Sequence, residues 1–185
     1  MKKRIIALGL LWCLSAVMLQ AARVDTVLVR SAAMNKDVKV VYVLPDKAIG
    51  KQACPVVYLL HGYGGNARSW VQLKPELPQM ADEKGIIFVC PDGKNSWYWD
   101  SPENPAYRYE TFVTSELVKY TDGNYATIPD RKARAISGLS MGGHGALWRS
   151  GYTAVPPELG NEQAVGRVCC QQGILGCAYG GQPAG

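Results

Sequence analysis

Histidine is scarce in this sequence of 185 residues, where His61 and His144 are the only two. The six cysteines show no CxxC spacing, so neither residue type supplies the closely spaced ligands that a zinc site needs. The cysteines do not predict a disulfide framework either, because Cys13 lies in an N-terminal apolar segment and leaves an odd number behind it. We therefore expect no metal site, and we expect Cys54 and Cys90 to be small buried core residues.

A basic surface stripe is also absent. Three of the 20 basic residues, Lys2, Lys3 and Arg4, stand at the N-terminus, and without them 17 basic residues face 15 acidic ones, a net charge of about +2. The remaining charges are scattered, and no aromatic residues alternate with them. Because nucleic-acid-binding proteins usually carry a clustered basic patch, we expect no nucleic-acid partner.

The N-terminal apolar run is too short for a typical membrane span. It extends from Ile5 to Leu19, 15 residues, whereas a spanning helix needs about 20. A basic start precedes this run and the small residues Ala21 and Ala22 follow it, which is the layout of an export signal. We predict that residues 1–22 are a signal peptide and that the mature protein is periplasmic or secreted, with no stable membrane span. The alternative is a retained N-terminal anchor.

The pattern of apolar residues predicts an α/β fold. Val24 to Arg30 and Val38 to Leu44 alternate as β-strands do and flank a turn, so we expect them to pair antiparallel. Two unbroken apolar runs and a third segment that leads into a glycine-rich turn then predict buried strands, with helical segments between them. The apolar runs are 56–60 and 86–90, the third predicted strand is 132–137, and the helical segments are 67–84, interrupted near Pro75 and Pro78, and 107–120. This order is typical of a doubly wound, mostly parallel sheet with helices on both faces.

The last 37 residues, Arg149 to Gly185, break this pattern. Eight of them are glycines, three are cysteines, and no apolar run is longer than two or three residues. The segment predicts neither a strand nor a helix. Residues 23–148 are therefore the expected folded unit, the front part of an α/β domain that is incomplete at its C-terminus.

The sharpest motif is Gly138-Leu139-Ser140-Met141-Gly142, which fits G-x-S-x-G. This spacing suits a turn from a strand into a helix, because the flanking glycines let the backbone turn sharply and expose the serine hydroxyl. A predicted strand precedes the motif, and the helix-compatible segment 143–148 follows it. We predict that Ser140 is a nucleophile; the alternative is a glycine-rich turn that merely caps a helix.

A second glycine-rich segment, His61-Gly62-Tyr63-Gly64-Gly65, directly follows the first buried strand. In α/β enzymes with a nucleophilic serine, the loop after such a strand gives one backbone N–H to the oxyanion, and the residue after the nucleophile gives the other. The predicted donors are Met141 and Tyr63, with Gly62 as the alternative to Tyr63. The competing interpretation is an ordinary turn between a strand and a helix.

Neither histidine is a convincing general base for Ser140. His61 belongs to the glycine-rich loop, where an imidazole more often braces the turn, and His144 lies one helical turn past the serine. The aromatic segment Trp97-Tyr98-Trp99 is predicted to line a pocket for the acyl or alcohol group, although such residues pack in a core or lid just as often.

Three segments together resemble the esterase D-like family of serine hydrolases: 59–65, Pro91-Asp92-Gly93 and 137–147. That family includes tributyrin esterases, S-formylglutathione hydrolases, feruloyl and acetyl-xylan esterases, and mycolyltransferases. The resemblance runs from about Arg23 to Trp148. It implies an α/β-hydrolase fold and a carboxylic ester hydrolase without a cofactor, in which Ser140 attacks a small-molecule or carbohydrate-linked ester and water releases the acid.

The sequence departs from the family after His144. The family's triad needs an Asp and then a His after the nucleophile, and neither residue type occurs beyond His144. We therefore predict that the chain is truncated or frameshifted after about Trp148, that residues 149–185 are out of frame, and that the chain as written is inactive. Two other functions stay open: acyl transfer of the mycolyltransferase type, and a non-catalytic binding module that keeps the hydrolase pocket.

Overall fold

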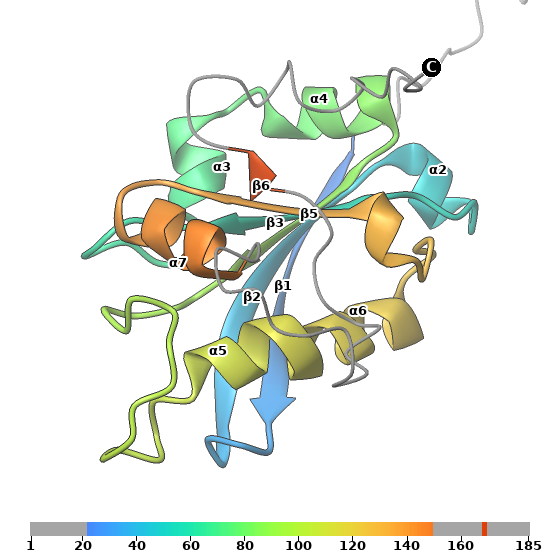
Figure 1. Ribbon diagram of the computed structural model, residues 1–185. Helices are drawn as coiled ribbons and strands as arrows, with labels where there is room; N and C mark the ends of the chain where they lie inside the picture. The colour runs from blue at the N-terminus through green and yellow to red at the C-terminus, as the bar shows by residue number, and fades with distance from the viewer. Residues whose placement is uncertain (1–21, 150–167, 170–185) are drawn as a thin grey trace, which may run out of the picture.

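A computed structural model describes residues 22–149 and 168–169 (Figure 1). Its centre is one mixed sheet with the strand order β1-β2-β4-β3-β5-β6. The strands are β1 (Arg23–Ser31), β2 (Lys36–Leu44), β3 (Val56–Leu60), β4 (Ile87–Pro91), β5 (Arg134–Gly138) and the two-residue β6 (Val168–Cys169). The pairs β1/β2 and β2/β4 are antiparallel, and all other neighbours are parallel. The predicted α/β fold with an antiparallel N-terminal pair is confirmed.

Helices cover both faces of this sheet (Figure 1). One face carries α3 (Ser69–Leu73) and α4 (Leu77–Lys84), and the other carries α5 (Tyr109–Thr111), a π-helical turn (Phe112–Glu116), α6 (Leu117–Asn124) and α7 (Met141–Arg149). Two further short helices, α2 (Asp46–Ile49) and a 3₁₀ turn (Arg131–Ala133), connect strands. Along β3, Tyr58 and Leu60 point into the core beneath α6, whereas Leu59 points into the core beneath α3. Successive side chains of a strand point to opposite faces of the sheet, and here both faces are covered by helices. The central strands therefore contain few polar residues.

The segment predicted as an interrupted helix, 67–84, forms α3 and α4. The break at Pro75 is expected, since a proline ring clashes with the preceding helical turn. Pro78 was predicted to interrupt the helix, but it does not. It lies in the first turn of α4, where the N–H that proline lacks would have no helical partner anyway.

One prediction about the C-terminal segment was wrong. The sequence pattern predicts no strand between Arg149 and Gly185, yet Val168–Cys169 pair in parallel with Ile136–Ser137 of β5 as β6. The outer edge of β5 presents backbone N–H and C=O groups, and extended residues that reach such an edge can pair with it whatever their side-chain pattern. The predicted signal peptide up to Ala21 and the rest of the predicted out-of-frame segment lie outside the described residues.

The carboxyl ends of β3, β4 and β5 meet at one edge of the sheet. Leu60 at the end of β3 is in register with Gly138 at the end of β5, and β4 runs parallel on the other side of β3. From these ends the chain continues into the loops 61–68 and 92–108 and into the turn at Ser140. Ligand sites of parallel sheets lie at this edge, and the three predicted site segments gather there.

Candidate active site

Ser140 lies in the sharp turn between β5 and α7, and it is exposed. Its φ is +52°, a left-handed conformation that costs a residue other than glycine roughly 1–3 kcal/mol. Close backbone approaches surround the turn: a Cβ at Gly138 would lie 2.1 Å from the carbonyl carbon of Gly142, and a Cβ at Gly142 would lie 2.3 Å from Leu60 O. The predicted context of a strand, a tight turn and a helix is confirmed.

The loop after β3 packs directly against this turn. A Cβ built at Gly62 would lie 3.3 Å from Leu139 O and 3.6 Å from Ser140 Cβ, so the main chain of Gly62 lies beside the serine. The Leu139 N–H donates to Leu60 O at 3.1 Å and ties the two segments together. Met141 is the first residue of α7, and the first N–H groups of a helix have no acceptor within it. The structure therefore brings the backbones of Gly62 and Met141 next to Ser140.

Tyr63, the other predicted oxyanion donor, follows Gly62 in a tight turn. The Gly65 N–H donates to Gly62 O at 3.0 Å, and the φ of +76° at Gly64 favours a glycine there. The Tyr63 side chain is 67% exposed, so this residue could reach an oxyanion only through its main chain. The Gly64 N–H donates to Asn95 Oδ1 at 2.8 Å and so fixes the loop from outside. Nothing in the sequence marks Asn95 for this role.

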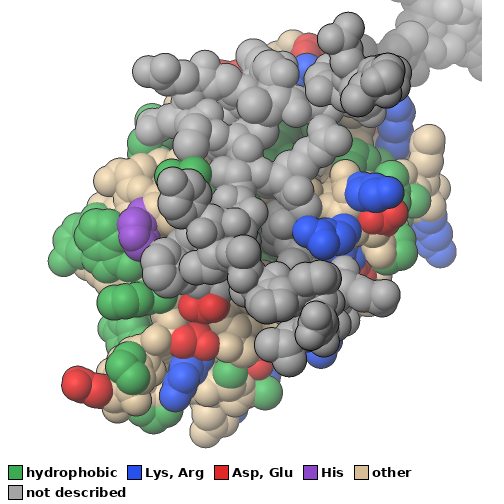
Figure 2. Space-filling model, in the orientation of Figure 1, with side chains coloured by type: hydrophobic (Ala, Val, Ile, Leu, Met, Phe, Trp, Pro, Cys, Tyr) green, Lys and Arg blue, Asp and Glu red, His purple; other side chains and the backbone are tan. Residues whose placement is uncertain are grey.

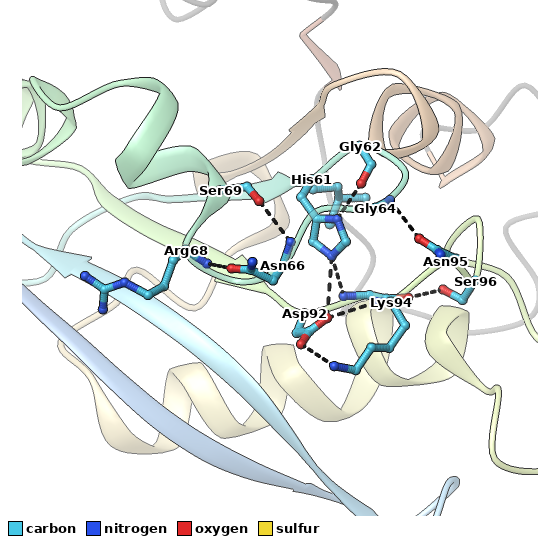
Figure 3. A network of polar contacts seen from close by, with 12 residues as sticks. His61, Gly62, Gly64, Asn66, Arg68, Ser69, Asp92, Lys94, Asn95 and Ser96 are labelled. Atoms are coloured by element: carbon cyan, nitrogen blue, oxygen red, sulfur yellow. Dashed lines mark hydrogen bonds and ion pairs between the residues drawn. The ribbon is translucent and has the colours of Figure 1, made fainter.

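His61 is buried and braces the same loop (Figure 3). The Gly93 N–H donates to His61 Nε2 at 2.9 Å, so Nε2 is the acceptor nitrogen and Nδ1–H donates to Gly62 O at 2.7 Å. These contacts assign the neutral tautomer with the proton on Nδ1. Both ring nitrogens are engaged within the loop network, which confirms the expected bracing role of His61.

Asp92 lies at the base of this network (Figure 3). Its Oδ1 is 3.6 Å from His61 Nε2, beyond a hydrogen bond, while the Lys94 N–H and ammonium donate to its two oxygens at 3.0 and 2.8 Å. Burial by itself raises the pKa of Asp92, but the two hydrogen bonds from Lys94 and the charge of its ammonium outweigh this effect, so the net pKa lies well below the usual range of a carboxyl. A carboxylate is thus held beneath the loop that follows β3.

Tyr98 lies beneath the aromatic loop and not on its surface. The ring is buried between Gly93 and Gly145, where added Cβ atoms would lie 2.2 and 2.8 Å from it. Its hydroxyl accepts from the His61 N–H at 2.9 Å. This differs from the expectation that Tyr98 lines a surface pocket. Two consecutive left-handed residues, Trp97 at φ +57° and Tyr98 at φ +58°, direct the chain so that the Tyr98 ring points inward.

Tyr98→Phe is expected to lower the free energy of unfolding by about 1–3 kcal/mol, because the ring stays in place while the buried His61 N–H loses its acceptor. Urea unfolding measures the change. Tyr63→Phe is the matched control, since that side chain is exposed and its loss should shift stability by no more than about 0.5 kcal/mol. Equal effects of the two substitutions would contradict the assigned hydrogen bond.

His144 lies on α7, one turn beyond the serine. Its N–H donates to Ser140 O at 3.0 Å, and its ring packs edge-on against Trp97 with 5.4 Å between the ring centroids. Figure 2 shows a histidine among hydrophobic side chains on the face in view, in keeping with this packing. The imidazole is thus placed against the aromatic loop.

A pocket of about 350 Å³ lies in the 92–108 loop. Its lining consists of Asn95, Ser96, Trp99, Ser101, Asn104 and Tyr107. Of the three aromatic residues predicted to line a pocket, Trp99 belongs to this lining, and it is 54% exposed. Trp97 is also half exposed but packs on His144.

Other sequence expectations concern metals, thiols and membranes. Cys54 and Cys90 are buried and free as predicted, and burial raises the pKa of both thiols. Among residues 22–149 and 168–169, no group of three or more His, Cys, Asp or Glu residues could hold a metal ion. No helix in the described part of the chain is long and apolar enough to cross a membrane.

Comparisons with known proteins agree on one family. The Esterase family model, described as "Putative esterase", matches residues 31–154. An acetyl esterase from Caldicellulosiruptor saccharolyticus is 30% identical over an alignment of 125 residues, and the match covers 63% of this chain and 46% of that protein. The solved S-formylglutathione hydrolase from Agrobacterium tumefaciens has a TM-score of 0.60 at 27% identity and covers 70% of this chain and 56% of its own. A ferulic acid esterase structure has a TM-score of 0.60 at 28% identity, with 77% and 57% covered. The chain thus spans about half the length of these relatives.

Proposed function

Because the chain belongs to the Esterase family, as its resemblance to esterase D-like enzymes predicted, we propose that it is the nucleophile-bearing part of a carboxylic ester hydrolase that acts through Ser140. The observation that carries this proposal is the turn itself, an exposed serine at φ +52° beside the main chain of Gly62. Such strain persists where the surrounding structure enforces it, and here it presents a hydroxyl.

In the proposed reaction, Ser140 Oγ bonds to the ester carbonyl carbon, and the carbonyl oxygen takes the negative charge. The N–H of Met141 and that of Tyr63, or of Gly62 in its place, donate to this oxyanion. The intermediate then collapses, and the alcohol leaves with the proton that the serine gave up. Water hydrolyses the acyl-serine and releases the acid. The hydrogen bond from Gly64 to Asn95 supports this assignment, since it holds the donor loop in place before substrate arrives.

The reaction needs a general base. No His and no Asp follows His144 in the sequence, and His61 uses both ring nitrogens in its own network. We propose that the coding sequence is truncated or frameshifted after about Trp148, so that residues 149–185 are out of frame. We further propose that this 185-residue chain hydrolyses esters slowly. Support comes from the half-length coverage of the relatives and from the end of the family match at residue 154, a few residues beyond the proposed break.

Sequencing the coding DNA tests the frameshift directly. Another reading frame beyond codon 148 is expected to encode further buried strands, an Asp and then a His, in that order. If no frame carries this pattern, the missing triad residues are a property of the gene, and the proposal of an out-of-frame segment fails.

The experiment for the proposed function is acylation of the serine. The chain is incubated with p-nitrophenyl acetate, and mass spectrometry is expected to find an acetyl group on Ser140. Acetylation that reaches lysines but leaves Ser140 unmodified would contradict the proposal.

Two alternatives differ from this proposal in measurable ways. An acyltransferase would pass the acetyl group from Ser140 to an added alcohol in preference to water, and a non-catalytic binding module would not become acetylated there. The strained turn argues against the binding module, because a pure binder gains nothing from the conformation of Ser140. We also propose that the protein is exported, on the basis of the signal-like residues 1–22.

A further inference from the structure

Asp82, in the last turn of α4, holds two segments together at the end of the sheet where β1 begins (Figure 1). Its Oδ2 accepts a hydrogen bond from the Ala22 N–H at 2.6 Å, and its Oδ1 accepts one from the Asp46 N–H at 2.8 Å. Ala22 directly precedes β1, and Asp46 is the first residue of α2. The main-chain nitrogen of Ala22 therefore has a fixed place in the fold, at the carboxylate of Asp82.

The side chain of Ala22 is also part of the core. It is 8% exposed and belongs to the apolar cluster beneath α3 and α4, together with Val43, Leu77 and Phe88. Ala22 is thus anchored by both its backbone and its side chain, one residue before the sheet begins. A peptidase that removed Ala22 would remove a buried, hydrogen-bonded residue from the fold.

Two carboxylates meet at this point, and no basic side chain is paired with them. Asp46 Oδ1 is shielded from solvent and accepts no hydrogen bond from the described residues. Burial raises the pKa of Asp46, and the negative charge of Asp82 raises it further. Among residues 22–149 and 168–169, no Lys or Arg forms a salt bridge with either carboxylate. Because the last turn of a helix also disfavours an acid, the arrangement favours a cation beside Asp82.

An α-ammonium group at Ala22 would supply this positive charge. In the uncleaved chain the Ala22 nitrogen is a neutral amide with one N–H. A free N-terminus has three N–H donors, and with an ordinary pKa of about 8 it is mostly charged at pH 7. One donor can keep the bond to Asp82 Oδ2, and another is available to Asp46, which contacts the same carboxylate. Hydrogen bonds between charged partners are stronger than those of a neutral amide.

The sequence alone leaves the cleavage bond of the signal peptide open. Export peptidases cut after a small residue, and both Ala21 and Ala22 are small. Cleavage after Ala22 would leave Arg23 at the N-terminus and would remove the residue that Asp82 holds. Cleavage after Ala21 would keep that residue and place the new ammonium group at the carboxylate. The burial and the hydrogen bond of Ala22 thus distinguish two bonds that look alike in the sequence.

We propose that an export peptidase cleaves the bond between Ala21 and Ala22 and that the new N-terminus docks on Asp82 as an ion pair. Water is the co-reactant: its hydroxyl goes to the Ala21 carbonyl carbon and its hydrogen to the Ala22 nitrogen, and the new acid then gives its proton to the new amine. Cleavage precedes folding, because Ala22 is buried in the folded chain. The mature chain then starts at Ala22, one residue earlier than a signal peptide of residues 1–22 implies. This inference rests on the proposed export and is independent of the chemistry at Ser140.

N-terminal sequencing tests the cleavage bond, and it needs only the processed chain, whether folded or not. The full 185-residue chain is expressed in a Gram-negative host, and the exported product is sequenced. The expected product begins Ala-Arg-Val-Asp, which is residues 22–25. A product that begins at Arg23, or at any other residue, overturns this inference but leaves the proposed export intact. A chain that is not cleaved overturns both.

Unfolding in urea tests the docked ion pair. The mature chain with a free α-ammonium group is compared with its Nα-acetylated form, which has lost the charge but keeps one N–H. Acetylation is expected to lower the urea midpoint by about 0.3–1 M. In Asp82→Asn the same acetylation should have less than about half of this effect, whereas in Glu83→Gln, at the exposed neighbouring position, it should have the full effect. If acetylation does not shift the midpoint, or shifts it equally in Asp82→Asn and wild type, the docking is overturned.

Discussion

Gly142→Ala is expected to destabilise the chain strongly and to lower its soluble yield. The added Cβ would lie 2.3 Å from the backbone oxygen of Leu60 and 2.5 Å from its carbonyl carbon. That carbonyl cannot retreat, because Leu60 ends the buried strand β3 and its oxygen accepts from the Leu139 N–H and from Trp70 Nε1. Overpacking a core costs about 1–3 kcal/mol, and more where backbone must move. Out of a total stability of about 5–15 kcal/mol, we expect a loss of more than about 3 kcal/mol.

Gly123→Ala is the matched control. Gly123 lies in α6, and a Cβ there would meet no atom within 4 Å. Alanine in place of a helical glycine should raise stability by about 0.5–1 kcal/mol. The soluble yield and the urea midpoint of both variants are compared with those of wild type. A Gly142→Ala variant as soluble and stable as wild type would show that the turn and the loop after β3 are further apart than described.

Ser140→Ala is expected to abolish acetylation at this site and any ester turnover that depends on it. In a complete catalytic triad, loss of the serine lowers kcat by about 10⁶-fold. In this chain the starting rate is already low, so added imidazole is used as an external base to accelerate the reaction of Ser140 with p-nitrophenyl acetate. Imidazole also hydrolyses this ester by itself, and Ser140→Ala provides that background. If imidazole accelerates both proteins equally, Ser140 is not the nucleophile.

Ser140→Gly separates the chemical role of this residue from its conformational cost. Glycine also lacks the hydroxyl, so it should be as inactive as Ser140→Ala. However, glycine adopts a φ of +52° without strain, whereas alanine does not. We expect Ser140→Gly to be about 1 kcal/mol more stable than Ser140→Ala, measured by urea unfolding. Equal stability would mean that the turn is not strained.

Much of the fold could be predicted from the sequence because its signals are local. The alternation in residues 24–44 and the apolar runs 56–60 and 86–90 correspond to β1 through β4, with boundaries that differ by at most two residues. The third predicted strand, 132–137, begins later than predicted, since Arg131–Ala133 form a 3₁₀ turn before β5 starts at Arg134. The short strand β6 could not be predicted, because edge pairing depends on backbone groups and leaves little trace in a two-residue pattern.

The candidate site was predictable to a smaller extent. The G-x-S-x-G spacing predicted the turn at Ser140, and the glycines after β3 predicted a loop close to it, which the position of Gly62 bears out. The aromatic loop was harder to interpret. Its three rings look alike in sequence, yet Trp99 lines the pocket, Trp97 packs on His144 and Tyr98 is buried under His61. Backbone conformation at Trp97 and Tyr98 decides this, and neither residue type favours a positive φ.

The sequence by itself determined most of the strands and helices and where the backbone must turn, because periodicity, proline and glycine act on neighbouring residues. Only the tertiary structure decided which loops meet. The contact of Gly62 with Ser140 and the hydrogen bond from Gly64 to Asn95 follow from the strand order β4-β3-β5 and its register. The hydrogen bond from the Lys36 ammonium to Ala106 O likewise joins residues 70 positions apart. Such contacts depend on how the whole sheet is assembled, and no local pattern encodes them.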